Sequence, residues 1–214
     1  MLGVFHLRGR LRVRPGATAH ASVRCTLPRC VRSLVAAICV SLLACNAHGQ
    51  MNTVTEEYRT KATFLATFPS FVEWRDEAFA ESSAPFLVCV VGDFRFGTSL
   101  AELTRNSFAH KRRVEVRWIH KEAELRKCHI LFVSRSESHR YAKLLQSIQG
   151  ADVLTVGETT DFLSAGGALS FYFEDRSLQF EVNLLAMNEA HLRVSSRLLA
   201  LARRVVGKTE AAKG

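Results

Sequence analysis

Six short apolar runs, each bounded by turn-forming residues, constrain the fold of this 214-residue chain more than any other feature. They are residues 86–91, 114–119, 130–134, 153–156, 168–173 and 178–183. Runs of this length are typical of strands that are buried on both faces of a sheet. Residues 99–104 and 137–148 lie between the earlier runs and have helical patterns. This alternation predicts βα units with much parallel pairing.

The two ends of this region have different patterns. Before the first run, Tyr58, Ala62, Leu65 and Phe68 recur at helical spacing, and Pro69 should end or kink that helix. The last two runs flank the turn residues 174–177 and predict a hairpin. Residues 188–206 predict a final helix. The predicted fold is therefore a single α/β domain: a mixed five- to six-stranded sheet with helices on both faces and a C-terminal β-hairpin plus helix.

The first fifty residues do not belong to this pattern. They contain seven Arg, no Lys and no acidic residue, and residues 31–44 are almost wholly apolar. A basic segment before a short apolar core predicts a signal peptide, here residues 1–49, with cleavage after Ala47-His48-Gly49. The basic segment is long enough that the true start could lie downstream of Met1. The competing interpretation is a lipoprotein anchored at Cys45, since residues 42–45 resemble a lipobox. Residues 51–207 then form the domain, and residues 208–214 a flexible tail.

Removing the signal peptide changes the charge of the protein. The whole chain carries a net charge of +9, whereas residues 51–214 carry 22 Lys and Arg against 20 Asp and Glu. Most of the basic character therefore belongs to the export signal. A domain so nearly neutral lacks the electrostatic signature of a nucleic-acid-binding protein.

The cysteine count changes in the same way. Only Cys89 and Cys128 remain in the exported domain. Cys89 lies within the first apolar run and Cys128 comes just before the third, so adjacent strands could bring them together. In an oxidising compartment such a pair predicts a disulfide rather than a metal or redox site. His129 would then be a neighbour of the disulfide with no chemical role. The five histidines of the domain show no metal-ligand spacing, so no metal is predicted.

Two stretches contain residues typical of catalytic sites, but each lacks a residue or motif that the chemistry requires. Residues 92–97 have the two-glycine spacing of a phosphate loop, but Thr98 stands where the loop needs its lysine. The serines at 134, 136 and 138 precede His139 without the Gly-x-Ser-x-Gly motif of a nucleophile elbow, so they are interpreted as helix caps. The sequence predicts neither an enzyme nor a cofactor.

Several stretches, in order, resemble the YfiR-like family of periplasmic proteins. They include Lys61-Ala62-Thr63-Phe64-Leu65 with Phe71-Val72-Glu73-Trp74, the strand and turn of residues 88–97, Cys128-His129-Ile130-Leu131-Phe132-Val133-Ser134, and Phe180-Glu181-Val182-Asn183. The resemblance covers nearly all of the domain.

The resemblance implies a regulatory binding protein. It implies a periplasmic repressor that binds the periplasmic domain of an inner-membrane diguanylate cyclase, lowers cyclic di-GMP and biofilm formation, and is itself sequestered by an outer-membrane lipoprotein. The alternative is a periplasmic small-ligand-sensing module that serves another membrane receptor, such as a histidine kinase.

A partner-binding surface is predicted around Glu181 and Asn183, with Leu169 and Met187 as a small apolar anchor. The acidic residue matches a position on the family's functional surface. The residue types alone allow an alternative, in which Glu181 pairs internally with Arg197 and Asn183 caps the following turn.

The domain is also predicted to form a homodimer, as the family does. Phe64, Phe68 and Phe71 are the candidate contacts, because they exceed what one helix needs to bury. Packing in the protein's own core is the alternative for each of them.

Overall fold

The structure is a computed structural model that describes residues 55–207, except residues 82, 94, 97 and 176. The predicted signal peptide, Cys45 and the predicted tail of residues 208–214 lie outside the described residues. Within the described part, no helix is both long and apolar enough to span a membrane.

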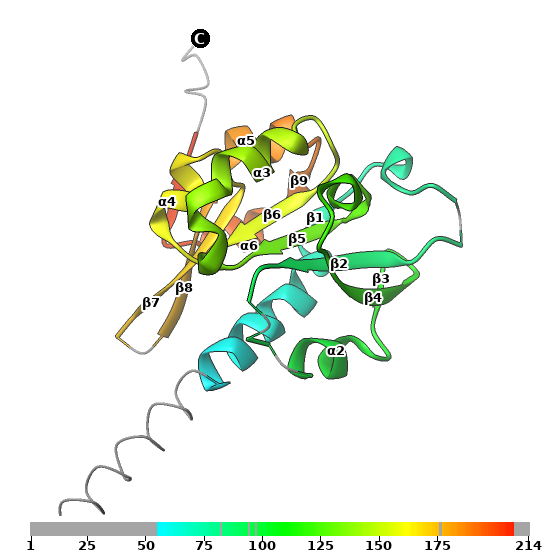
Figure 1. The fold of residues 1–214 in the computed structure, drawn as a ribbon, viewed down its shortest axis with the longest axis horizontal. Coiled ribbons are helices and arrows are strands. Elements are labelled where there is room, and N and C mark those ends of the chain that lie inside the picture. The colour runs from blue at the N-terminus through cyan, green and yellow to red at the C-terminus, as the bar shows by residue number, and fades with distance from the viewer. Residues whose placement is uncertain (1–54, 82, 94, 97, 176, 208–214) are drawn as a thin grey trace, which may run out of the picture. The chain divides into compact units, whose positions relative to one another are not determined.

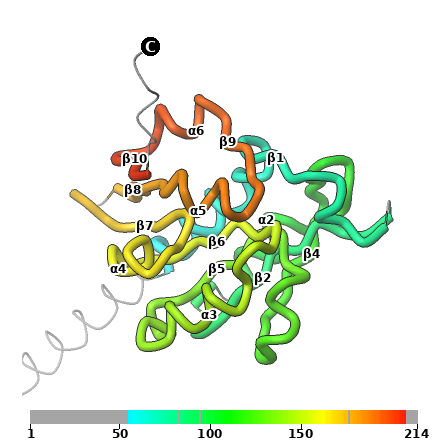
Figure 2. Tube along the Cα trace, turned by 90° about the horizontal axis from the view of Figure 1, so that it is seen from above, coloured from blue at the N-terminus to red at the C-terminus, as the bar shows by residue number. Residues whose placement is uncertain are grey.

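Eight strands form the main sheet, in the spatial order β10-β8-β7-β6-β5-β2-β4-β3 (Figure 1). They are β2 (Phe86–Val91), β3 (Phe108–Ala109), β4 (Arg112–Trp118), β5 (Ile130–Val133), β6 (Leu154–Gly157), β7 (Leu169–Glu174), β8 (Ser177–Asn183) and β10 (Arg204–Val206). A separate pair joins β1 (Val72–Glu73) to β9 (Arg193–Val194). Figure 2 shows β8 and β10 at one end of the main sheet and β4 towards the other.

Short helices connect the strands. The α-helices are residues 55–67, α2 (Ser99–Thr104), α3 (Tyr141–Ser147), α4 (Thr160–Ser164), α5 (Leu184–Glu189) and α6 (Ser196–Leu201). The 3₁₀ helices are η1 (Phe68–Ser70), η2 (Asp76–Ala78), η3 (Glu122–Lys127) and η4 (Arg135–Arg140).

The predicted α/β class is confirmed. Strands β4, β2, β5, β6 and β7 are parallel to one another, and β8 returns antiparallel to β7 as the predicted hairpin. All six predicted strands are present. The short strands β3 and β10 raise the number in the main sheet to eight, above the five or six expected, because two- and three-residue strands give no recognisable run in the sequence.

An apolar core lies on each face of the sheet. Side chains alternate along β2: Val88 and Val90 belong to one core, and Leu87 and Cys89 to the other. The helix of residues 55–67 and α2 cover the first face, and α3 and α4 cover the second (Figure 1). Because both faces are covered, the central strands β2 and β5 are apolar at every position.

The helix of residues 55–67 follows its predicted stripe. Tyr58, Ala62 and Leu65 are buried against the first core. The helix ends at residue 67, and the chain tightens into η1, which contains Pro69. Proline cannot donate the backbone hydrogen bond that an α-helix would need there, so the predicted end is confirmed.

The predicted final helix over residues 188–206 is wrong. The chain forms α5, β9, α6 and β10 instead. His191 adopts a positive φ of 54°, which stops α5, and Ser195 then starts α6 by accepting a hydrogen bond from the Leu198 amide at 3.3 Å. Ala202 is extended and leads into β10, which pairs in parallel with β8. The apolar residues that suggested one helical stripe are distributed over three short elements.

Candidate functional site

The carboxyl ends of the parallel strands are the expected position of a ligand site in this fold. In open α/β sheets, ligands bind in the crevice at these ends, where the strand order reverses direction. Here the chain passes from β2 outward to β4 and then back across to β5, so the reversal lies between β2 and β5. The residues that follow β2, β5 and β6 are Gly92, Ser134 and Glu158.

The helix of residues 55–67 occupies this position. The hydroxyl of Tyr58 donates to both carboxylate oxygens of Glu158, at 2.9 and 2.8 Å, and Lys61 Nζ donates to the same carboxylate. The Tyr58 ring packs edge-on against Phe96, in the loop after β2, with the ring centroids 5.2 Å apart. One turn of the helix therefore contacts the segments that follow both β2 and β6.

Glu158 is the centre of a buried polar network, which we call the Glu158 network. Besides Tyr58 and Lys61, the Ser134 hydroxyl donates to its carboxylate at 3.1 Å and the Arg135 amide at 2.7 Å. The side chains of Lys61 and Glu158 are 1% and 0% exposed. A charged pair this deeply buried requires close pairing and hydrogen bonds, and here it has both.

The electrostatics of the network keep the carboxylate charged. Burial by itself would raise the pKa of Glu158, but the Lys61 ammonium and the hydrogen bonds from Arg135, Lys61 and Tyr58 outweigh it, so the pKa lies below its ordinary value. Burial and the neighbouring Glu158 charge raise the pKa of Tyr58. Glu158 therefore stays ionised and Tyr58 stays protonated near neutral pH, and groups that do not change protonation there are poor acid–base catalysts, which favours a structural role.

Sequence reasoning missed the Glu158 network. One signal was available: Lys61 lies on the same helix face as Tyr58, Ala62 and Leu65, and a lysine on a buried face requires a partner. The identity of that partner was not predictable, because Glu158 lies 97 residues further along the chain.

The glycine loop after β2 is a turn. Gly92 has a positive φ of 98°, and a Cβ there would lie 2.6 Å from Ser136 Oγ. The Asp93 amide donates to that same hydroxyl at 3.1 Å, and the Asp93 carboxylate pairs with Arg95. This amide is therefore already engaged within the protein.

The predicted disulfide is present. Cys89 and Cys128 are joined with an S–S distance of 2.01 Å and a Cα–Cα distance of 5.9 Å. Strands β2 and β5 are direct neighbours, and both cysteines are buried in the second core.

His129 has a structural role that the sequence did not predict. Its Nδ1 accepts the Leu87 amide at 2.9 Å, at the start of β2. The ring stacks between Phe79 and Phe86, with centroid distances of 4.5 and 4.8 Å. Burial lowers the pKa of His129 from 6.5 to about 4. The imidazole is therefore neutral near pH 7 and acts as a hydrogen-bond acceptor.

This arrangement predicts a pH dependence of stability. As the pH falls from 6.5 towards 4, the unfolded chain binds a proton at residue 129 that the folded protein does not bind. The free energy of unfolding should decrease over this range by up to about 1.4 kcal/mol per pH unit from this group. Urea unfolding between pH 7 and 5 measures the slope. His129→Gln should flatten it, and the exposed His139→Gln should not; equal slopes in all three proteins would contradict this role.

The predicted partner-binding residues divide into two groups. Glu181 forms a bidentate pair with Arg204, at 2.9 and 2.6 Å, and not with Arg197. Asn183 Oδ1 caps α5 by accepting from the amides of residues 185 and 186, at 3.1 and 3.3 Å. Both polar residues thus make the kind of internal contact that the alternative predicted.

The predicted apolar anchor is not available at the surface. Leu169 and Met187 are both 0% exposed and belong to the first core. They lie on the face that the helix of residues 55–67 covers, so they stabilise the sheet in this conformation and cannot contact a partner. The prediction of an exposed anchor at these two positions is wrong.

A polar hollow lies on the other face of the hairpin. It is lined by Thr160, Tyr172, Glu174, Glu181, Arg203 and Arg204. Arg203 pairs with Glu174 at 3.5 Å, beside the Glu181–Arg204 pair. The Arg204 side chain is 58% exposed. Glu174, Arg203 and Arg204 are thus exposed side by side, whereas Glu181 is buried against Arg204 at 9% exposure, and we call this surface the Glu181 face.

The three candidate dimer residues pack within the protein to different extents. Phe68 is fully buried, and its ring stacks on Phe171 at 5.7 Å. Phe64 and Phe71 are partly buried against the same core. Core packing thus accounts for Phe68, and only Phe64 and Phe71 retain exposed surface for the predicted dimer.

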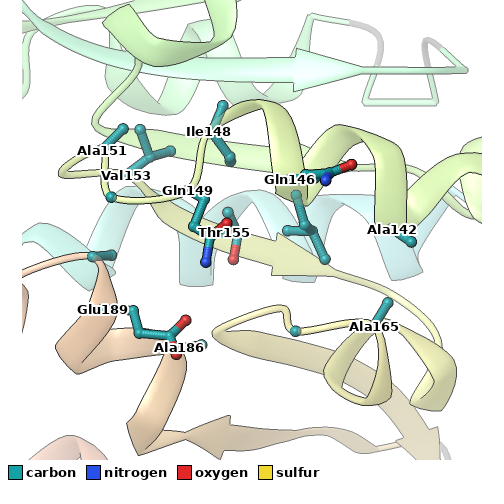
Figure 3. Close-up of a pocket in the computed structure, with 14 residues that line it drawn as sticks. Ala142, Gln146, Ile148, Gln149, Ala151, Val153, Thr155, Ala165, Ala186 and Glu189 are labelled. Carbon is teal, nitrogen blue, oxygen red and sulfur yellow. The ribbon is translucent and has the colours of Figure 1, made fainter.

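A second hollow lies over the start of β6, between α3, α4 and α5 (Figure 3). Its volume is about 240 Å³, and half of the residues that line it are alanine or glycine. Glu189 is the one charged side chain in its lining, and Thr155 at its base accepts a hydrogen bond from the Ala168 amide at 2.9 Å. Nothing in it resembles a catalytic arrangement. Among the described residues, no group of three or more His, Cys, Asp or Glu side chains could hold a metal ion.

Comparison with known proteins places this geometry in a family. No curated protein matches the chain. Ten solved chains match. One is a conserved domain protein from Vibrio cholerae O1 biovar El Tor, with 14% identity, a TM-score of 0.42, and coverage of 56% of this chain and 54% of that one. Another is the ABC domain from Streptococcus pneumoniae in complex with L-tryptophan, with 11% identity, a TM-score of 0.43, and coverage of 56% and 55%.

The chain thus spans about half the length of these two solved chains, and TM-scores this low carry no argument about function. The family comparison is more informative. The model of the domain family DUF4154, described as YfiR/HmsC-like, matches residues 58–203, which is more than half of the chain. The matched span begins at Tyr58 in the Glu158 network and ends at Arg203, so it includes the network and all of the Glu181 face except Arg204. The chain therefore belongs to the YfiR/HmsC-like family.

Proposed function

We propose that this protein is a periplasmic regulator that binds the periplasmic domain of an inner-membrane diguanylate cyclase and represses it. Repression would lower cyclic di-GMP and biofilm formation. The YfiR/HmsC-like family fits a regulator of diguanylate cyclase signalling. The predicted signal peptide supports an export route, and the Cys89–Cys128 disulfide is typical of an oxidising compartment.

The filled crevice is the observation that carries the proposal. The position where open α/β sheets bind small ligands is occupied by Tyr58 and Lys61 of the protein itself. A protein whose usual ligand crevice is filled can act through its surface. Regulation by binding another protein needs only such a surface.

We assign partner recognition to the Glu181 face. Glu174, Arg203 and Arg204 present charges of both signs at the surface, and the buried Glu181 holds the Arg204 guanidinium in place. Charged groups of this kind set orientation and partner choice at protein interfaces. A homodimer, and sequestration by an outer-membrane lipoprotein, are further parts of this proposal, and light scattering tests the dimer.

A charge exchange on this face tests the recognition role. Glu181→Lys places two cations together, so the melting temperature should fall slightly. The variant should also release the cyclase, and cyclic di-GMP should rise to the level of a deletion strain. Glu181→Lys/Arg204→Glu restores an internal pair with reversed polarity. Its melting temperature should return to that of the wild type while repression stays lost. Cyclic di-GMP in complemented deletion strains is the measurement.

The control for this exchange is Glu102→Lys, an exposed change on α2. It should leave both melting and repression unchanged. If the double variant restores repression together with melting, the Glu181–Arg204 pair is purely structural and the assignment of the face is wrong.

A further inference from the structure

The opposite end of the sheet carries an uncovered basic surface. Strand β3 pairs with β4 so that Phe108 lies directly across from Arg113. Residues directly opposite each other on paired strands share a face of the sheet, as do alternate residues along one strand. Phe108, Arg113, Glu115 and Arg117 therefore lie on one face.

These side chains are exposed. Phe108 is 69% exposed, more than any other described large apolar side chain; Leu201 follows at 63%. Arg113 is exposed, and the Arg117 side chain is 50% exposed. Helices α3 and η3 pack over the second core farther along this face, whereas Phe108 and Arg113 at the β3–β4 end are exposed. A large exposed aromatic side chain thus lies beside an exposed arginine.

Most of the cations on this surface form no ion pair with a described residue. Neither Lys111, in the β3–β4 turn, nor Arg113 forms an ion pair with any described residue. Arg117 pairs with Glu115 at 3.0 Å. Lys127, which is also exposed, lines a hollow with Arg117 beside the disulfide.

Arg112 is the remaining basic residue of the β3–β4 hairpin, and unlike Arg113 its side chain is held by contacts within the protein. It lies on the other face, where its guanidinium donates to the carbonyls of residues 81 and 84 and covers the Phe79 ring at 4.0 Å. We call the surface formed by Phe108, Lys111, Arg113, Arg117 and Lys127 the basic face.

Positive charge is concentrated in this part of the chain. Residues 105–127 contain eight Lys and Arg and three Asp and Glu. The rest of residues 51–214 contains 14 Lys and Arg and 17 Asp and Glu. The domain is therefore electrostatically polarised, with one basic end on an otherwise slightly acidic body.

We propose that the basic face binds the surface of an anionic lipid bilayer. Lysine and arginine are attracted to anionic headgroups, and an exposed phenyl ring gains by entering the boundary between headgroups and acyl chains. The acidic remainder of the domain is repelled by the same surface, so only one orientation is favoured. An unpaired aromatic beside unpaired cations fits a bilayer better than it fits an acidic protein, which would leave the ring in water.

This inference does not rest on the proposed function. The basic face and the Glu181 face lie at opposite ends of the sheet. A protein bound to a bilayer through the basic face would therefore leave the Glu181 face free to bind its partner. Loss of membrane binding and loss of cyclase binding are therefore separately measurable.

Sedimentation with lipid vesicles tests the proposal on the purified exported chain. Vesicles containing phosphatidylglycerol should carry the wild-type protein into the pellet at low salt and release it at high salt, whereas phosphatidylcholine vesicles should not bind it. Lys111→Gln and Arg113→Gln should each weaken binding about five-fold. Phe108→Ser should weaken it about ten-fold.

The matched controls are Arg197→Gln and Leu201→Ser, which change an exposed cation and an exposed apolar residue on α6. They should bind as the wild type does, with all proteins showing the same circular dichroism. Failure of the wild type to bind anionic vesicles overturns the proposal, and so do controls that weaken binding equally. Binding to polyglutamate without binding to vesicles would assign the face to an acidic protein and likewise overturn it.

Discussion

Substituting Lys61 with methionine is expected to lower the free energy of unfolding by about 3–5 kcal/mol. Methionine fills the space of the lysine stem but removes the cation from a carboxylate that is fully buried. Glu158 then keeps its desolvation cost with the half-exposed Arg135 guanidinium, 3.6 Å away, in place of its buried cationic partner, or it must take up a proton. Urea unfolding at pH 7 measures the loss. The loss is large because one side of a buried pair is removed while the other side remains.

The pH dependence of this loss has a defined sign. The pKa of Glu158 lies below its ordinary value of 4.5, so its contribution to stability is present above that pH and is lost as the pH falls through the lowered pKa. The difference between the wild type and Lys61→Met should therefore be largest near neutral pH and should shrink in acid.

Two further variants separate the pair from the helix that carries it. Arg59→Met changes an exposed cation on the same helix and should shift stability by less than about 0.5 kcal/mol. Lys61→Met/Glu158→Gln removes both charges and should recover part of the loss. If Lys61→Met lowers the free energy of unfolding no more than Arg59→Met does, the Glu158 network does not anchor the helix.

Removing the disulfide is expected to have the second largest effect. The bridge joins residues that are 39 apart, and closing a loop of this length stabilises a domain by about 3–4 kcal/mol on the chain-entropy model. Cys89→Ala/Cys128→Ala should lose about this amount in urea unfolding, and the reduced wild type should behave similarly. The double variant avoids leaving a single free thiol in the second core.

Mass spectrometry of the non-reduced protein provides the accompanying check. Protein isolated from the periplasm should contain no free thiol at Cys89 or Cys128. Two free thiols there would contradict the bridge. An unchanged melting temperature after verified reduction would show that the bridge contributes little to stability.

The strands were predictable because their environment is uniform. Each central strand is covered on both faces, so residues 86–91 are all buried, and the sequence shows one uninterrupted apolar run. The helix of residues 99–104 and the hairpin of β7 and β8 were predictable for related local reasons. The disulfide was predictable from the expected oxidising compartment and from the number of cysteines, since only two remain after the predicted signal peptide.

The C-terminal segment was not predictable, because its apolar spacing fits more than one structure. Leu192, Leu198 and Val205 fall on one helical stripe, yet they lie in a loop, α6 and β10. Pairing of β10 with β8 brings Arg204 opposite Glu181. That contact depends on a crossover through three elements, so the sequence alone suggested the wrong arginine.

The Glu158 network was not predictable for a related reason. Lys61 shows that its helix face needs a partner for a buried charge, but the sequence contains twenty acidic candidates beyond residue 50. Only the sheet order, which places the end of β6 beside the helix, selects Glu158. The filled crevice on which the proposed function rests was therefore visible only in three dimensions.

The most direct test of the central claim is the cellular level of cyclic di-GMP in a strain that lacks this protein. If the protein represses a membrane diguanylate cyclase, deletion should raise the level, and the wild-type chain, but not Glu181→Lys/Arg204→Glu, should lower it again. A level that is unchanged by deletion would contradict repression.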